Sequence, residues 1–211
     1  MLKKHLLLIG MTTSLLLLII AAFYYPGGSQ NDLNSIGYSW ENNYLSNLFA
    51  PKAVNGMDNL ARPWAVAGML ALAISFAIFF SAFSKKIEHK GAARVIQFCG
   101  VSAMGFAFLT VTPLHDQMVK IASTLSLVAL FYITVFVLKS KLLLFKILSI
   151  VILLLLYTSL FLYYSRTYLE FLPIMQKAAF GMTMGWALGL QYFSEAGDFQ
   201  FGKKTGDGSG E

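Results

Sequence analysis

The 211-residue chain has little charge, few histidines and a single cysteine. Only 12% of its residues are charged, whereas 57% are hydrophobic, and the mean hydropathy is +0.65. A soluble domain of this size could not hide so much apolar surface, so the composition excludes an ordinary soluble fold. Because Cys99 has no second cysteine to pair with, the chain can form neither an internal disulfide nor a thiolate metal cluster.

Long apolar runs are separated by short polar clusters, as expected for a chain in lipid. A run of about 20 residues forms a helix about 30 Å long, which matches the hydrocarbon thickness. The alternating pattern of a membrane β-barrel is absent from the sequence. We therefore predict an all-α integral membrane protein, a bundle of six transmembrane helices. The predicted spans are residues 6–25, 63–83, 93–112, 119–138, 144–164 and 174–193.

The first run also has the basic start of a secretory signal peptide, with Lys3 and Lys4. Its apolar part is longer than a usual signal core, and it ends in FYYPGG instead of a small-residue cleavage site. We therefore favour an uncleaved span. Under either interpretation, the segment that follows lies outside the cytoplasm.

The net charge of +6 does not indicate nucleic-acid binding, because the basic residues form no stripe or patch and lie at the ends of the apolar runs. With the N-terminus inside, most of the 16 basic residues fall in cytoplasmic parts. This bias predicts a bacterial cytoplasmic membrane protein with both termini in the cytoplasm. The basic residues left outside are Lys52, Arg62, Lys120, Arg166 and Lys177.

One folded unit is expected. Residues 1–194 would form the membrane domain, and residues 195–211, which contain GKKTGDGSGE, a flexible cytoplasmic tail. No internal repeat relates the first three spans to the last three, and apart from Ser, Thr, Gln97 and Gln191 the middle of each span is apolar. Both features weaken the interpretation as a small transporter, which stays as a second alternative.

The first outer connection, residues 26–62, is much longer than the others and carries several aromatic residues. A disordered linker would have few aromatics, so we expect an ordered extracytoplasmic loop. The spacing of Trp40, Tyr44, Leu48 and Phe49 predicts a short amphipathic helix that lies on the membrane or caps the bundle.

His115 and Asp116, in the turn VTPLHDQMVK, are candidates for acid–base chemistry. His115 would be a general base oriented by a carboxylate, with Ser46 as a nucleophile. However, adjacent helical residues point about 100° apart, so we do not expect these two side chains to share a hydrogen bond. No G-x-S-x-G elbow is present. The pattern favours a polar turn in which Asp116 caps the next helix, with a lipid hydrolase or transferase as the alternative.

A histidine metal site is not expected. The predicted topology places His5 and His89 inside and His115 outside, so the three histidines cannot converge on one zinc ion. A site of His115 with Asp116, Asp58 or Glu170 stays as an alternative, but we predict neither a metal nor another cofactor.

Charged residues of the three outer connections are expected to form a polar pocket for a lipid head group or a small ligand. Lys120 and Lys177 lie inside their spans, where a charge must snorkel, pair or line a wet cavity. The candidate ligand-binding residues are Asp58, Arg62, His115, Lys120, Arg166, Glu170 and Lys177. Three oppositely charged pairs have the spacing of helical ion pairs, namely Asp58 with Arg62, Asp116 with Lys120, and Arg166 with Glu170.

Three glycines of the last span, Gly181, Gly185 and Gly189, recur every four residues. Such a ladder of small residues permits close helix packing, within the bundle or between the subunits of a homo-oligomer. Trp64 and Trp186 are interpreted as anchors at the membrane interface.

Four segments carry a resemblance to a known group: NNYLSNLFAP (42–51), NGMDNLARPWAVAGML (55–70), TPLHDQMVKIAS (112–123) and LPIMQKAAF (172–180). With them the chain resembles bacterial multi-span membrane proteins of unknown function that are distantly similar to the DRAM, FRAG and Sfk families. The resemblance covers residues 1–194 and implies a six-helix integral membrane protein, but no reaction. Where the family pattern often has Ser-Asp-Leu-Gly, this chain has SNLF at 46–49. The sequence favours a non-enzymatic protein whose partners are membrane lipids.

Overall fold

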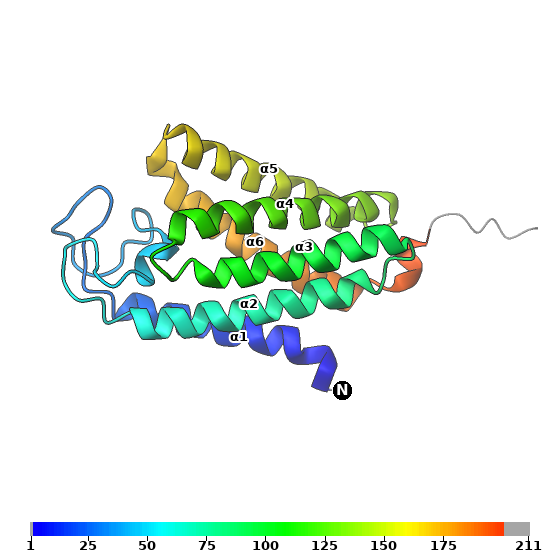
Figure 1. The fold of residues 1–211 in the computed structure, drawn as a ribbon, viewed down its shortest axis with the longest axis horizontal. Coiled ribbons are helices and arrows are strands. Elements are labelled where there is room, and N and C mark those ends of the chain that lie inside the picture. Colours follow the sequence, from blue (N-terminus) through cyan, green and yellow to red (C-terminus); the bar gives the residue numbers. More distant parts are fainter. Residues whose placement is uncertain (1, 201–211) are drawn as a thin grey trace, which may run out of the picture.

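In the computed structural model, which describes residues 2–200, the chain forms one bundle of six α-helices (Figure 1). Within this range there is no β-strand, only two isolated bridges. The predicted all-helical class is therefore confirmed. The helices are α1 (Leu2–Phe23), α2 (Arg62–Ser84), α3 (Lys90–Leu109), α4 (His115–Lys139), α5 (Leu143–Ser165) and α6 (Leu172–Phe193).

Successive helices run in opposite directions, so their connections gather at two ends (Figure 1). The loop end carries residues 24–61, 110–114 and 166–171, and the terminal end carries the start of α1 and the end of α6. Helices α1 to α5 are each long and apolar enough to cross a membrane, whereas α6 is not among these. Helix α6 carries the polar residues Gln176, Lys177 and Gln191.

The core is built on α2, whose Phe79, Phe80 and Phe83 are fully buried. Trp186 of α6 packs against Phe79 and is only 2% exposed. Its indole Nε1 donates a hydrogen bond of 2.9 Å to Ser149 Oγ on α5, as a buried indole N–H requires. The expectation that Trp186 is an interface anchor was therefore wrong, because position in a span does not reveal which face a residue occupies.

Small residues bring α1 and α2 together. Gly10 lies directly against Ser75, and a Cβ added at Gly68 would be 3.2 Å from the backbone oxygen of Ser14. In the predicted ladder of α6, only Gly189 lies against a neighbour, because a Cβ there would approach the ring of Phe145 on α5 to 2.6 Å. A Cβ at Gly181 or Gly185 would meet nothing within 4 Å.

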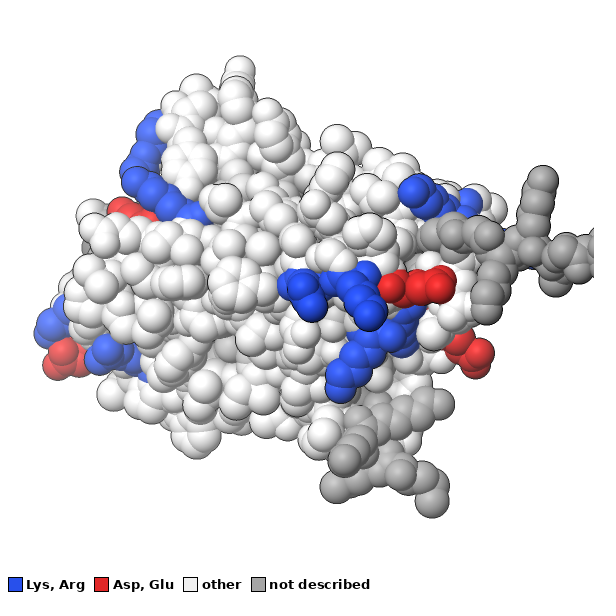
Figure 2. All heavy atoms as spheres, turned by 45° about the vertical axis from the view of Figure 1, so that its right-hand side comes forward, with Lys and Arg blue, Asp and Glu red and all other residues white. Residues whose placement is uncertain are grey.

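Charged side chains gather toward the two ends of the bundle, with a largely uncharged surface between them on the face shown in Figure 2. At the terminal end, Lys86 Nζ donates to the backbone oxygens of Leu190 and Ser194, at 3.0 and 2.8 Å. Burial lowers the pKa of Lys86, and the nearby Asp198 and Glu195 carboxylates oppose that shift. This lysine thereby satisfies carbonyls at the C-terminus of α6, where a cation is favoured.

The chain remains packed beyond α6. Ala196–Phe199 form a 3₁₀ turn (η3), and Phe199 is 1% exposed with its ring 5.1 Å from that of Phe83. The expected flexible tail was therefore wrong for residues 195–200. Residues 201–211 lie outside the described part of the chain.

Residues 24–61, which we call the loop-end segment, fold over the loop end of the bundle. The expected amphipathic helix is reduced to one 3₁₀ turn, η1 (Leu45–Leu48). Leu48 and Phe49 are buried as the amphipathic pattern predicted, but Trp40 lies outside the turn and is 55% exposed. The segment is ordered by side-chain hydrogen bonds instead of by a helix.

The Asn59 side chain makes several of these hydrogen bonds. Its Nδ2 donates to the backbone oxygens of Asn47, Leu48 and Ala50, at 3.0, 3.2 and 2.8 Å, and its Oδ1 accepts from the Ala61 amide. The side chain thus satisfies polar backbone groups in a stretch without regular structure, as buried groups require.

We predict that Asn59→Asp will destabilise the loop-end segment by about 1–3 kcal/mol, because the amide donor is replaced by an oxygen that faces three carbonyl oxygens. Thermal unfolding and the rate of limited proteolysis within residues 24–61 measure the effect. Asn34→Asp is the matched control, since it makes the same change at an exposed position of the segment. Equal proteolysis rates for the two variants would contradict this role of Asn59.

Candidate ligand-binding site

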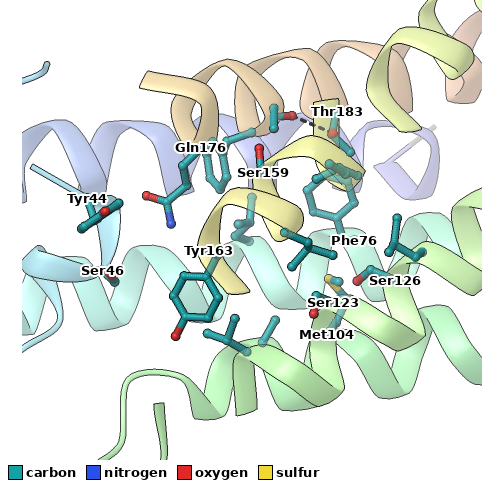
Figure 3. A pocket seen from close by; sticks show the side chains of 18 of the residues that line it. Tyr44, Ser46, Phe76, Met104, Ser123, Ser126, Ser159, Tyr163, Gln176 and Thr183 are labelled. Carbon is teal, nitrogen blue, oxygen red and sulfur yellow. Dashed lines mark hydrogen bonds between the residues drawn. The ribbon is translucent and has the colours of Figure 1, made fainter. Parts of the chain in front are cut away.

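A cavity of about 510 Å³ opens among α2, α3, α4, α5 and α6 toward the loop end, and we call it the main cavity. Figure 3 shows Tyr44, Ser46, Tyr163 and Gln176 near one end of it and Phe76 further along. The residues at the loop end are Tyr44, Ser46, His115, Asp116, Tyr163, Arg166 and Gln176. The deeper wall is mostly apolar, with Phe76, Phe80, Met104, Leu127, Leu130 and Leu156, and carries the hydroxyls of Ser123, Ser126, Ser159 and Thr183.

Helix α5 leaves room for the main cavity. It lies at the edge of the bundle and leans away from α4 toward the loop end (Figure 1). Its last part, from Leu156 to Arg166, lines the cavity. The helix ends where Arg166 adopts a left-handed φ of 57°, and Tyr168 follows with a φ of 52°. Non-glycine residues rarely adopt this conformation, and here the pair turns the chain back into α6.

His115, Asp116 and Tyr163 form a connected group at the mouth of the cavity. The Nδ1 atom of His115 lies 3.1 Å from Asp116 Oδ1, and the Tyr163 hydroxyl donates to the same oxygen at 2.9 Å. The expectation that His115 and Asp116 do not share a hydrogen bond was wrong. Both stand in the first turn of α4, and their side chains turn toward each other although their Cβ atoms diverge.

Asp116 does not cap α4 as expected. The N-cap position is Leu114, which makes no side-chain cap bond, and Asp116 lies within the first turn. A carboxylate there still interacts favourably with the positive end of the helix. Its oxygen, however, is used to orient His115 and Tyr163, which links α4 to α5.

Contacts from the loop-end segment complete the mouth. The Leu45 amide donates to Gln176 Oε1 on α6 at 3.0 Å, and the Tyr44 hydroxyl donates to the backbone oxygen of Leu169 at 3.4 Å. Burial raises the pKa of Tyr44, and the charge of Arg166 acts against that shift. Tyr44 and Ser46 are thereby fixed beside α6 and face the main cavity.

The structure brings together only part of the predicted ligand-binding set. His115 and Arg166 line the main cavity, together with the candidate acid–base residue Asp116. Lys177 lines a second cavity, between α1 and α6. Lys120 and Glu170 line neither of the two.

The remaining two, Asp58 and Arg62, serve the loop-end segment. Asp58 forms an ion pair of 2.5 Å with Lys52, and Arg62 Nε donates to the backbone oxygen of Phe49 at 3.2 Å. None of the three expected i,i+4 ion pairs is formed among the described side chains. Asp58 pairs with Lys52 instead of Arg62, and Asp116 is hydrogen-bonded to His115 and Tyr163 instead of pairing with Lys120.

Sequence reasoning missed several cavity residues. Neither Tyr163 nor Gln176 was among the predicted site residues, although both line the main cavity. The hydroxyls of Ser123, Ser126 and Ser159 are spaced irregularly along α4 and α5, so their convergence depends on helix packing. Within the described residues, no three His, Cys, Asp or Glu side chains are grouped as a metal site would require.

No protein-family model matches the chain, and no curated protein or solved structure matches it either. The interpretation of the site therefore depends on its geometry and chemistry.

We predict that Ser126→Cys will react several times faster with a small maleimide than Ala129→Cys, both in a Cys99→Ala background in detergent. Ser126 lines the main cavity, whereas Ala129 on the same helix is 0% exposed and buried in the core. Mass spectrometry of the labelled protein gives the two rates. Equal rates would show that the cavity is closed to small molecules.

Proposed function

We propose that this chain is a six-span membrane protein that binds a lipid-like amphiphile in the main cavity. Five helices have the length and apolar composition of spans. For α6, the support is that Trp186, Ala187 and Leu190 are buried in the same core as the other helices, so α6 would cross with them. The resemblance to the bacterial relatives of the DRAM, FRAG and Sfk families agrees with six spans.

In the proposed orientation the loop end is extracytoplasmic and the terminal end cytoplasmic, in a bacterial cytoplasmic membrane. The support is the bias of lysine and arginine toward the terminal end. The main cavity would then open near the outer head-group region, where the polar ends of lipids lie.

The observation that carries the proposal is the change of polarity along one cavity. Its mouth holds charged and hydroxyl groups, and its depth is lined mostly by apolar side chains. Its volume of about 510 Å³ lies in the usual range for small-molecule sites. Along α4 the lining extends from His115 to Leu130, which is about 22 Å at 1.5 Å per residue. A long, mostly apolar space with a polar mouth fits an acyl chain with a polar head.

The charges at the mouth favour an acidic head group. The guanidinium of Arg166 lies over the ring of Tyr163, 5.5 Å from its centroid, and makes no ion pair with a described carboxylate. Asp116 Oδ1 is hydrogen-bonded to His115 and Tyr163, and this carboxylate forms no ion pair with Arg166. A carboxylate or phosphate of the ligand would therefore find Arg166 available for a charge-assisted hydrogen bond. Binding alone, without chemistry, accounts for this arrangement.

We predict that Ser126→Phe will reduce the binding of a fluorescent long-chain fatty acid strongly, because the new ring fills the apolar depth. Arg166→Ala should weaken binding by about tenfold, equivalent to about 1.4 kcal/mol, through the loss of one charge-assisted contact. Val128→Phe is the matched control, since Val128 is on the same helix but lines neither the main cavity nor the second one. Displacement of the probe gives the affinities.

Unchanged binding in Ser126→Phe would overturn the proposed site, provided the variant shows the same unfolding temperature as Val128→Phe. Loss of binding in both phenylalanine variants would show that the probe binds to the lipid-facing surface instead of the main cavity.

A second candidate function is hydrolysis or acyl transfer. It is favoured by the hydrogen bond between Asp116 and His115 Nδ1, which leaves Nε2 free to act as a base, and by Ser46, which lines the same cavity. The carboxylate would orient the imidazole as in a nucleophilic triad.

If the protein is such an enzyme, His115→Ala will abolish release of fatty acid from lysophospholipid or monoacylglycerol, and Ser46→Ala will do the same. His89→Ala, at the far end of the bundle, is the control. Absence of hydrolysis by the wild-type protein, or activity retained in His115→Ala, would exclude this function and leave the binding role.

A further inference from the structure

A second cavity, of about 340 Å³, lies between α1 and α6, and we call it the α1–α6 groove. Its walls are almost entirely apolar. The lining residues on the two helices include Met11, Leu15, Ile19, Phe180, Met184 and Leu188. At the loop end it is closed by Trp40 and Leu45, and Lys177 is the one charged residue that lines it.

Lys177 is half-buried, and its ammonium group has only neutral partners among the described residues. Its Nζ donates to the backbone oxygens of Asn43 and Pro173, the second at 3.0 Å. It also lies 5.6 Å from the centre of the Tyr38 ring. An ammonium has three N–H donors, so one is left for a further acceptor in the groove.

The missing partner of Lys177 is an anion. A cation removed from water is costly unless it is paired, and two carbonyls and an aromatic face compensate only part of that cost. Neither of the described ion pairs includes Lys177. A phosphate at the loop end of the groove would complete both its hydrogen bonding and its charge.

Gly181 gives the groove room for a chain. It follows Lys177 by one helical turn and lines the groove, and a Cβ added there would meet nothing within 4 Å. By contrast, Gly189 of the same helix is in close contact with Phe145. The glycine therefore leaves an open apolar slot in the groove, one turn further along α6 than Lys177.

We propose that the α1–α6 groove binds one anionic phospholipid of the surrounding bilayer, with its phosphate on Lys177 and an acyl chain over Gly181. This inference depends on the proposed function only in that the chain spans a membrane. It concerns a site separate from the main cavity: Gln176 lines that cavity, the adjacent Lys177 lines the groove, and Phe180 forms part of the wall of both.

A second copy of the chain fits this groove less well than a lipid does. The six α-helices contain one carboxylate, Asp116, and it is already hydrogen-bonded to His115 and Tyr163. A helix of another subunit would therefore bring apolar surface to the groove but no anion to Lys177. A phospholipid supplies both.

Native mass spectrometry with phosphatidylglycerol and phosphatidylcholine supplied in equal amounts tests the proposal. We expect wild type to retain phosphatidylglycerol preferentially, Lys177→Gln to lose the preference, and Lys177→Arg to keep it. Lys120→Gln is the control, because Lys120 is an exposed lysine that lines neither cavity. An unchanged preference in Lys177→Gln would overturn the proposal.

Gly181→Leu tests the same site without touching the cation or its bonds to the loop-end segment. Its side chain enters open space, so the unfolding temperature should be preserved while the bound phosphatidylglycerol falls. If the wild-type protein is a dimer, Gly181→Leu is a monomer and lipid retention is unchanged, the groove binds a second copy of the chain and the proposal is wrong. Binding of the fatty-acid probe to the main cavity should be unaffected, so failure of one site is distinguishable from failure of the other.

Discussion

Two adjacent side chains of α6, Gln176 and Lys177, hold the loop-end segment onto the bundle. Gln176 accepts from the Leu45 amide, and Lys177 donates to the backbone oxygen of Asn43. Because adjacent residues of a helix point in different directions, one side chain faces the main cavity and the other the α1–α6 groove. The polar mouth of each cavity therefore depends on these two hydrogen bonds, and so does the position of Tyr44 and Ser46.

The helices differ in how closely they pack against their neighbours. Small residues let α1 approach α2, and the phenylalanines of α2 fill the space around Trp186, whereas the outer part of α5 leans away. An apolar helix in water would close against its neighbours, because the exposed surface would be too costly. In the proposed membrane, lipid tails cover such surface at little cost, so a helix can stand apart and leave a cavity that is stable without a ligand.

Much of the fold could be predicted from the apolar runs of the sequence, because runs of this length and composition have few alternatives to a helix. The side chains of the site were predicted less well. His115 and Arg166 line the main cavity, but Lys177 lines the α1–α6 groove, and Asp58 and Arg62 make their contacts within the loop-end segment. Spacing along a helix shows which residues share a face, but not which neighbour that face meets. The close approach of α1 to α2 at Gly10 and Gly68, and the burial of Trp186, depend on which neighbouring helix each face meets.

The central claim is that the main cavity holds an amphiphile with its head group at Arg166 and its tail along α4. An experimental structure of the protein in nanodiscs made with a bacterial lipid extract tests it most directly. We expect elongated density that begins beside Arg166 and Tyr163 and continues past Ser126 between the helices. A structure in which α5 closes on α4, with Leu130 and Leu156 in contact and no density between them, would contradict the claim.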